Sequence, residues 1–259
     1  MILQYKAINI FYTDTGKGNP VVFLHGFLET SNIWNPFVSN ISQNHRVVCI
    51  DLLGHGSTGC LGYIHTMELM AECVEAVLKH LKITESTLVG HSMGGYVALA
   101  FAEKNPNALK GLCLMNSTSK ADSSERKRNR DRAILAVKQN HETFTRMAIA
   151  NLFRPKNRTI FHKEIDLIKK EAMMMPLQGI VAALEGMKIR KDRAFILKNP
   201  DFEKMMIASK KDPVLNYDGL VGETKNTEVE FIDFPDGHMS HIENKDLFLQ
   251  TIMYFIEKI

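Results

Sequence analysis

Short apolar runs alternate along the chain with stretches in which apolar residues recur every three or four positions. Continuous apolar runs predict strands buried on both faces of a mostly parallel sheet at residues 20–24, 46–50, 88–89, 111–115 and 204–208. Helical periodicity predicts helices at residues 31–41, 66–81, 96–102 and 246–256. Alternation at residues 2–14 favours two short antiparallel strands, and residues 228–232 favour a further strand. The strand–helix order predicts an α/β fold with right-handed crossovers between parallel strands.

This alternation stops after Ser117 and resumes near residue 204. Between these points the sequence contains no convincing strand, only helical patterns at residues 125–140, 141–153, 161–175 and 177–187. We therefore expect an α/β core formed by residues 1–117 and 201–259, with a helical insertion over residues 118–200.

Composition adds limits on the class of protein. The chain has 259 residues, of which 45% are hydrophobic and 24% charged, which is typical of a globular protein with a sizeable core. A net charge of +3 is too small to favour binding to nucleic acid or to an anionic membrane. No stretch approaches the roughly 18 apolar residues of a membrane helix, and the first residues lack the pattern of a signal peptide. The expected location is the cytoplasm.

The four cysteines also favour a reducing compartment such as the cytoplasm. Cys49, Cys60, Cys73 and Cys113 have no spacing typical of a metal site, and three of them lie in apolar segments. We expect buried free thiols rather than disulfides. Neither a metal nor an organic cofactor is expected.

The candidate chemistry begins at Gly90-His91-Ser92-Met93-Gly94, where an apolar run meets a helical pattern. A strand, a sharp turn and a helix around Gly-x-Ser-x-Gly expose a nucleophilic serine on strained backbone. Gly90 and Gly94 would allow helix and strand to pass closely. The N–H of Met93, at the start of the helix, would be free to face a developing negative charge.

When its motifs are taken together in their order along the sequence, the chain resembles the α/β-hydrolase fold family over nearly its whole length. The residues that carry the resemblance are His25-Gly26-Phe27, Asp51-x-x-Gly54-His55-Gly56, Gly90-His91-Ser92-Met93-Gly94-Gly95, Asp212-Pro213 and Gly237-His238-Met239. The family orders its catalytic residues as serine, acid, histidine. The resemblance implies Ser92 as nucleophile, Asp212 as the acid that orients the histidine, and His238 as general base. The chain departs from the family pattern at Leu53 and Thr58, two positions of a structural loop where proline and serine are usual.

Each role has rivals. His241 lies three residues after His238, but His238 directly follows Gly237 and precedes an acidic residue, as the family histidine does. For the acid, Asp212 stands immediately after a strand and before a proline. The alternatives for the acid are Asp122, which some family members use, and the nearby Asp218, Asp233 and Asp236.

The resemblance also implies an oxyanion hole formed by the backbone N–H groups of Phe27 and Met93. His25 is expected to brace the loop that carries Phe27, and His91 is expected to pack beside the serine turn. Both histidines are also candidates for the substrate pocket.

A serine at position 92 favours acyl transfer, because relatives that displace halide or open epoxides use an aspartate there. The predicted activity is hydrolysis of a carboxylic ester or thioester of a small or acyl-chain substrate through an acyl-enzyme. Alternatives on the same fold are C–C bond cleavage of the menaquinone-pathway type, cofactor-free perhydrolysis, hydrolysis of an acyl-carrier-protein methyl ester, and ligand binding without catalysis. The alternative of C–C bond cleavage is weakened, because the relatives that catalyse it commonly have a basic residue soon after the serine turn. Here Tyr96 stands there and no arginine is close.

The family commonly inserts a helical cap over the serine, and residues 118–200 fill that position. Methionines such as Met147 and Met174 are candidates to line an acyl pocket there, although plain packing of amphipathic helices is the simpler interpretation. A basic cluster at residues 126–132 is typical of a solvated helix face. The sharper hypothesis is that Arg126, Arg128 and Arg130 dock an acidic acyl carrier protein.

Overall fold

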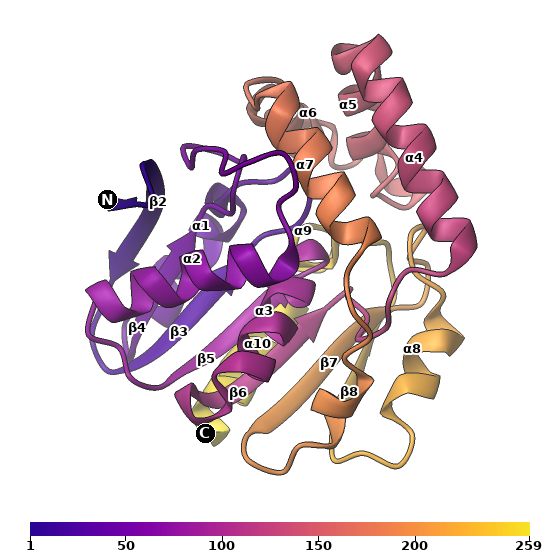
Figure 1. Cartoon of the computed structure of the whole chain (residues 1–259). Coiled ribbons are helices and arrows are strands. Elements are labelled where there is room, and N and C mark those ends of the chain that lie inside the picture. Colours follow the sequence, from indigo (N-terminus) through magenta and orange to yellow (C-terminus); the bar gives the residue numbers. More distant parts are fainter.

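The computed structural model describes residues 1–259 and is built around one eight-stranded sheet with the order β1-β2-β4-β3-β5-β6-β7-β8 (Figure 1). β1 pairs antiparallel with β2 and β2 antiparallel with β4, whereas all other neighbours are parallel. The strands are β1 (Ile2–Tyr5), β2 (Ile8–Thr15), β3 (Asn19–Leu24), β4 (His45–Ile50), β5 (Ser86–His91), β6 (Leu109–Met115), β7 (Glu203–Ser209) and β8 (Glu230–Phe234). The predicted α/β architecture is confirmed.

Successive residues of the central strands enter two different cores, as a strand period of two requires. In β3, Val22 and Leu24 pack under α2 (Met67–His80) and α3 (Met93–Lys104), whereas Val21 and Phe23 pack against α1 (Asn35–Ile41) and α10 (Lys245–Lys258). Figure 1 shows these two helical layers in front of the sheet and behind it. Because both faces of the sheet are covered, its central strands are apolar throughout.

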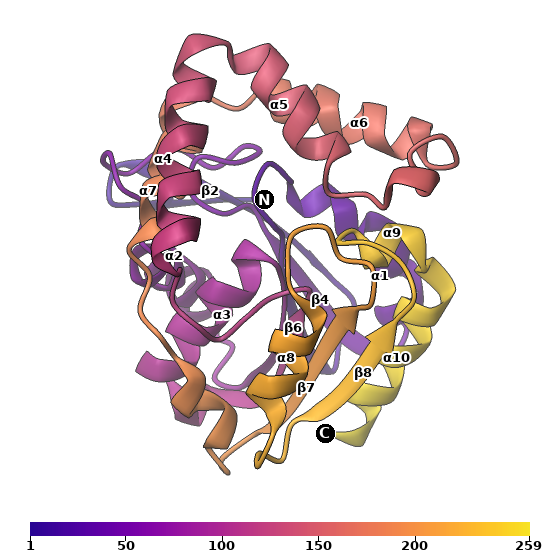
Figure 2. The same cartoon turned by 90° about the vertical axis from the view of Figure 1, so that its right-hand side faces the viewer.

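The chain between β6 and β7 forms four α-helices: α4 (Ser124–Gln139), α5 (His141–Ala150), α6 (His162–Met173) and α7 (Leu177–Lys188). In Figure 2 α5 and α6 lie across the top of the sheet, and α4 runs down at the left. Glu171 of α6 accepts hydrogen bonds from Thr30 and Asn32, at 2.6 and 2.9 Å, in the loop and 3-10 turn after β3. A Cβ atom added to Gly54 would lie 2.5 Å from Gly179 Cα, so α7 lies directly on the loop after β4.

The predicted elements and the observed ones differ mainly at the C-terminal edge of the sheet. The strand predicted at residues 228–232 is displaced by two residues to Glu230–Phe234, because β8 is a half-buried edge strand whose apolar pattern is weak. Two short helices, α8 (Tyr217–Thr224) and α9 (Ser240–Glu243), were not predicted, and the helix expected to reach residue 153 ends at Ala150. All four cysteines are free and three are buried, as expected.

Candidate active site

The turn between β5 and α3 holds Ser92 in a conformation that non-glycine residues rarely adopt. Ser92 has φ 49° and ψ −112°, and its N–H donates to the Met115 carbonyl at 2.9 Å. A Cβ on Gly90 would lie 2.5 Å from the Gly94 carbonyl oxygen, and one on Gly94 would lie 2.3 Å from the Leu24 carbonyl oxygen. Strand and helix therefore approach so closely that only glycine fits at these two positions.

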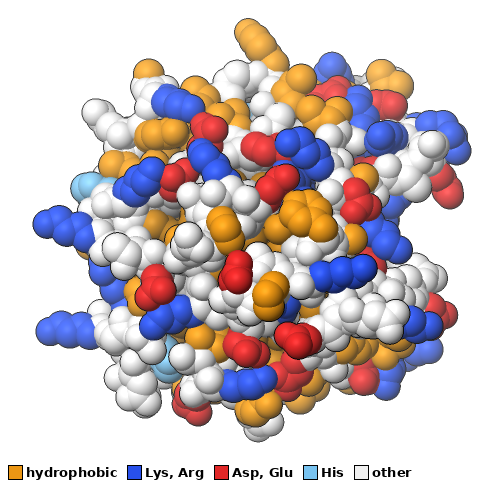
Figure 3. Space-filling view, turned by 60° about the horizontal axis from the view of Figure 1, so that its bottom comes forward, with side chains coloured by type: hydrophobic (Ala, Val, Ile, Leu, Met, Phe, Trp, Pro, Cys, Tyr) orange, Lys and Arg blue, Asp and Glu red, His pale blue; other side chains and the backbone are white.

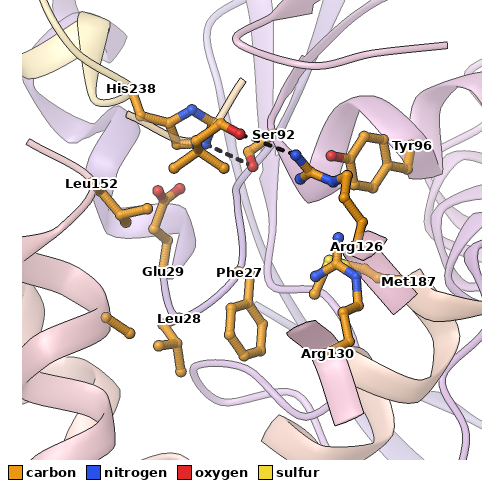
Figure 4. Close-up of a pocket in the computed structure, with 12 residues that line it drawn as sticks. Phe27, Leu28, Glu29, Ser92, Tyr96, Arg126, Arg130, Leu152, Met187 and His238 are labelled. Atoms are coloured by element: carbon orange, nitrogen blue, oxygen red, sulfur yellow. Dashed lines mark hydrogen bonds between the residues drawn. The ribbon is translucent and has the colours of Figure 1, made fainter. Parts of the chain in front are cut away.

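A chain of hydrogen bonds runs from the Ser92 hydroxyl to a buried carboxylate. The Ser92 Oγ lies 2.9 Å from His238 Nε2, and His238 Nδ1 lies 2.7 Å from Asp212 Oδ2 (Figure 4 shows the first of these contacts). The three residues follow β5, β7 and β8, whose carboxyl ends lie at one edge of the sheet. The structure thus brings together the three side chains that the sequence singled out.

Asp212 is held so that only one of its oxygen atoms faces the histidine. Its Oδ1 accepts hydrogen bonds from the N–H groups of Val214 (2.7 Å) and Leu215 (3.0 Å), and its Oδ2 accepts one from Asn116 Nδ2 at 2.9 Å. Burial raises the pKa of Asp212, but His238 and the hydrogen bonds from Asn116 and Val214 lower it by a larger amount. The pKa therefore lies below its ordinary value. The carboxylate is therefore charged at neutral pH. Asn116, which sequence analysis missed, directly follows β6 with φ 43°.

The two main rivals for these roles lie elsewhere. Asp122 is buried against Arg126, Arg130 and Arg190 rather than near His238. His241 is buried between the rings of Trp34 and His91, and neither of its ring nitrogens has a hydrogen-bond partner. Burial lowers the pKa of His241 to about 3, so its imidazole is neutral.

Two backbone N–H groups in the segments around Ser92 have no hydrogen-bond acceptor within the protein. Met93 is the first residue of α3, so its N–H has no acceptor within the helix. Phe27 lies in the loop after β3, and its N–H has no hydrogen-bond acceptor in the protein. His25 braces this loop from beneath, as expected: its Nδ1 donates to the Gly26 carbonyl at 2.8 Å and its Nε2 accepts from the Leu52 N–H at 2.9 Å.

A second buried pair, Glu29 and His91, supports the site and was not foreseen. Glu29 Oε2 accepts from the Gly26 N–H at 2.6 Å and lies 2.9 Å from His91 Nδ1, while His91 Nε2 lies 3.0 Å from the His238 carbonyl oxygen. Both ring nitrogens of His91 thus face acceptors, an arrangement that only an imidazolium with two N–H groups satisfies.

The ionisation of this pair follows from its geometry. Burial alone would lower the pKa of His91, but the Glu29 carboxylate outweighs that effect and the pKa is raised. Burial alone would raise the pKa of Glu29, but His91 and the Gly26 N–H lower it to about 2. The pair is an ion pair that links the loop after β3 to the backbone of His238.

A cavity of about 90 Å³ opens beside Ser92 and is shown in Figure 4. The core lines it with Phe27, Leu28, Glu29, Ser92, Tyr96, Val214 and His238, and the insertion lines it with Arg126, Arg130, Ala148, Leu152 and Met187. A wider cavity of about 330 Å³ adjoins it and shares Arg126, Arg130, Ala148, Leu152 and Val214. The insertion therefore forms one wall of the site.

Four of the residues predicted for the pocket do not line the cavity. Met174 is 85% exposed just after α6, and Met147 is 60% exposed on the outer face of α5. His25 and His91 are fully buried beneath the site, where their ring nitrogens form hydrogen bonds to backbone carbonyl groups of the surrounding loops. Among methionines of the insertion, Met187 is the one that reaches this cavity.

The basic cluster on α4 is divided by the helix period. Asp122, Arg126 and Arg130 are four residues apart and share the inner face, whereas Lys127, Arg128 and Arg132 are exposed. An acid followed by arginines at i+4 and i+8 is a signal that could have shown this pairing. No group of three or more histidine, cysteine, aspartate or glutamate side chains is arranged to hold a metal ion, and no helix combines the length and apolarity needed to cross a bilayer.

Comparison with known proteins gives matches over nearly the whole chain. A sequence profile described as "alpha/beta hydrolase fold" matches residues 19–245. The structure of a thermophilic esterase from Thermogutta terrifontis superposes with a TM-score of 0.91 at 28% identity, over 97% of this chain and 94% of that one. The enol-lactonase from Burkholderia xenovorans LB400 superposes with a TM-score of 0.90 over 99% of this chain and 100% of that one, but at 19% identity this likeness concerns the fold alone.

Curated relatives match over shorter stretches. A non-heme haloperoxidase of Rhodococcus erythropolis is 37% identical over 87 residues, which are 33% of this chain and 32% of the relative. Three mycobacterial relatives are 30% identical over 118 residues, and this chain spans 35% of their length.

Proposed function

This chain belongs to the α/β-hydrolase family, as its motifs predicted, and on that premise we propose that it hydrolyses carboxylic esters. The observation that carries the proposal is the hydrogen-bond chain from Ser92 Oγ through His238 to Asp212, at 2.9 and 2.7 Å. The likeness to the Thermogutta esterase, at 28% identity over 97% of this chain, supports an ester as substrate.

In the proposed reaction Ser92 is the nucleophile. A neutral hydroxyl attacks poorly, so His238 Nε2 takes the proton as Ser92 Oγ bonds to the ester carbonyl carbon. Asp212 keeps His238 in the tautomer whose Nε2 can accept that proton, and it stabilises the imidazolium that forms. The imidazolium then protonates the leaving alkoxide, which departs as the alcohol.

The negative charge on the carbonyl oxygen needs donors that are already in place. The N–H groups of Phe27 and Met93 are proposed to supply them, because neither is used within its own loop or helix. Glu29 fixes the Phe27 loop by accepting from the Gly26 N–H. A water molecule activated by His238 then hydrolyses the acyl-enzyme and restores Ser92.

The size of the inner cavity limits the acyl group. Its volume of about 90 Å³ is well below the roughly 300–1,000 Å³ of pockets that enclose drug-sized ligands. We expect p-nitrophenyl acetate to butyrate to be cleaved faster than longer esters.

The test combines labelling and turnover. A fluorophosphonate should label wild type and not Ser92→Ala, and Ser92→Ala should lose at least about 10³-fold in kcat on p-nitrophenyl butyrate. Ser39→Ala, an exposed serine on α1, is the matched control and should retain full activity. Unlabelled wild type, or turnover that survives Ser92→Ala, would overturn the proposal in favour of ligand binding without catalysis or of another nucleophile.

Perhydrolysis is a second candidate, favoured by the match to the Rhodococcus haloperoxidase. In this reaction hydrogen peroxide, in place of water, attacks the acyl-enzyme and releases a peracid. The rate at which peracetic acid forms from acetate and hydrogen peroxide should then depend on Ser92. Perhydrolysis is ruled out if Ser92→Ala forms peracetic acid at the wild-type rate.

Docking of an acyl carrier protein stays a prediction, now restricted to the exposed residues of α4. Since Arg126 and Arg130 turn inward, Lys127, Arg128 and Arg132 are the cations left for such a partner. Arg128→Glu should raise KM for a carrier-bound ester and leave KM for the free ester unchanged. A KM for the carrier-bound ester equal to that of wild type would contradict docking.

A further inference from the structure

The inner wall of the insertion carries more positive charge than its own acid can balance. One carboxylate, Asp122, pairs with three guanidinium groups: Arg126 Nε at 3.2 Å, Arg130 Nε at 2.5 Å and Arg190 Nη1 at 2.5 Å. Burial raises the pKa of Asp122, but Arg130 and Arg190 lower it more, so this carboxyl is ionised. Three positive charges against one negative charge leave an excess of two.

Two of these arginines line the cavity at Ser92. In Figure 4 Arg126 extends from the insertion toward Ser92 and Tyr96, and Arg130 lies beside Met187 on the same wall. Both also line the wider outer cavity, so they stand where the two cavities join. Arg190 is turned away from this junction: its guanidinium stacks on the Tyr96 ring at 4.1 Å and it lines neither cavity.

The Arg130 guanidinium is only partly used by the protein. Its Nε donates to Asp122, but its two Nη nitrogens have no acceptor within the chain, although the side chain is only 13% exposed. Arg126 donates from Nε to Asp122 and from Nη1 to the Val214 carbonyl at 3.0 Å, which leaves Nη2 free. A guanidinium presents a planar set of donors that matches a carboxylate, and such a bond is strong where water is largely excluded.

Two other carboxylates lie on the core side of the cavity, and both are already bonded within the protein. Asp212 lies behind His238 and accepts from it, from Asn116 and from backbone N–H groups. Glu29 lies on the opposite wall and is already paired with His91. Over the face shown in Figure 3, by contrast, basic and acidic side chains are intermingled. The positive charge of Arg126 and Arg130 therefore has no unpaired carboxylate beside it on the cavity wall.

We propose that Arg126 and Arg130 bind a carboxylate group of the ester substrate, so that the preferred substrates are short carboxylate-bearing esters. This inference rests on the proposed ester hydrolysis at Ser92. Two substrate types have the required chemistry: half-esters of short dicarboxylic acids, with the carboxylate on the acyl part, and acyl esters of short hydroxy acids, with the carboxylate on the alcohol part.

The first test changes only the charge of the substrate. Monomethyl esters of malonate to adipate are compared with the esters in which an amide replaces the free carboxylate, and O-acetylglycolate is compared with O-acetylglycolamide. We expect kcat/KM to favour the carboxylate about 10- to 100-fold in one of the two series, which also identifies the part that carries the charge. Ratios near one in both series would overturn the inference, while Ser92-dependent cleavage of the neutral esters would leave the proposed hydrolysis standing.

The second test changes the arginine. In Arg130→Gln the preference for the carboxylate should fall at least about 10-fold, mainly through KM, and Arg130→Lys should restore part of it. Arg128→Gln removes the same charge from the exposed face of the same helix and should keep the wild-type preference. An equal loss in Arg128→Gln would mean a general field effect and would overturn the assignment to Arg130.

A third measurement does not depend on turnover or on the folding of a variant. Glutarate should raise the Tm of wild type and inhibit cleavage of a neutral ester competitively, whereas glutaramide should do neither. If no ester is cleaved at all, protection by glutarate still supports an anion site while the proposed hydrolysis fails. If glutarate neither protects nor inhibits, the inference is wrong.

Discussion

The two walls of the cavity at Ser92 are built on different principles. On the core side, Glu29 lines the cavity while Asp212 and His91 lie behind it, and the side chains of all three are bonded to partners within the protein. On the wall formed by the insertion, Ala148, Leu152 and Met187 are apolar and Arg130 has two nitrogen atoms without an acceptor. Side chains bonded within the protein hold the reacting groups of the core in place and leave only backbone N–H groups, those of Phe27 and Met93, as unused donors there. The unused side-chain donors of Arg130 can instead recognise a ligand.

The two walls meet at His238. Its N–H donates to the Leu152 carbonyl of the insertion at 3.0 Å, and its carbonyl accepts from His91 of the core at 3.0 Å. Arg154 and Asn157 of the insertion also donate to Glu243, at 3.1 and 2.8 Å, just beyond the same loop. The insertion thus helps to place the base as well as to shape the cavity.

The largest expected effect lies on the core wall. Asp212→Asn keeps the shape of the side chain but removes the charge that selects the tautomer of His238, so kcat on p-nitrophenyl butyrate should fall by about 10⁴-fold. The control is Asp233→Asn, a rival acid that pairs with Lys210 at the surface, and it should keep wild-type kcat. Similar losses in the two variants would mean that the acid has been misassigned.

The second prediction compares an ion pair from each region. Glu29→Gln leaves the buried His91 without its counterion and should lower the free energy of unfolding by about 3–5 kcal/mol in urea titrations at pH 7. Glu142→Gln breaks the exposed pair with Arg146 on α5 of the insertion and should cost no more than about 1 kcal/mol. Equal losses would contradict a buried, ionised pair of Glu29 and His91.

The third prediction concerns pH and the neutral imidazoles beneath the core wall. Burial lowers the pKa of His241 to about 3, so between pH 3 and pH 6.5 the unfolded chain binds a proton there that the folded chain does not. Stability should therefore fall as pH decreases through this window, by up to about 1.4 kcal/mol per pH unit for this group.

His241→Phe tests this contribution. It keeps the aromatic contacts with Trp34 and Phe248 and removes two buried nitrogens that have no partner. The dependence of unfolding free energy on pH between 6 and 5 should be flatter than in wild type by about 1.2 kcal/mol per unit, because the unfolded histidine is not yet fully protonated at pH 6. Parallel curves would show that His241 is not the group that titrates.

The smallest effect is expected at the exposed methionines of the insertion. Met174→Ala should leave the preference among p-nitrophenyl esters within about 2-fold of wild type, since that side chain is 85% exposed. Met187→Ala is the matched change inside the cavity and should shift the optimum toward longer acyl chains. The same preference in both variants would contradict the cavity as the acyl site.

Prediction from sequence succeeded where a residue's environment is set by its immediate neighbours. The apolar run, the glycines and the helical pattern around Ser92 define the turn at short range, and the structure has β5, Ser92 and α3 in that order. It was less successful where an element depends on distant contacts. The displaced β8 and the unforeseen α8 lie at the sheet edge, where burial imposes a weaker pattern.

The sequence by itself determined the α/β fold, the family and the candidates Ser92, Asp212 and His238, because strand ends and turn glycines leave local patterns. Only the tertiary structure decided that Met147 and Met174 do not line the cavity, that Glu29 and His91 form a buried ion pair, and that Arg126 and Arg130 line the cavity at Ser92. The physical reason is that a helix period shows which residues share a face but not what that face packs against. That choice is made by contacts between segments far apart in the chain.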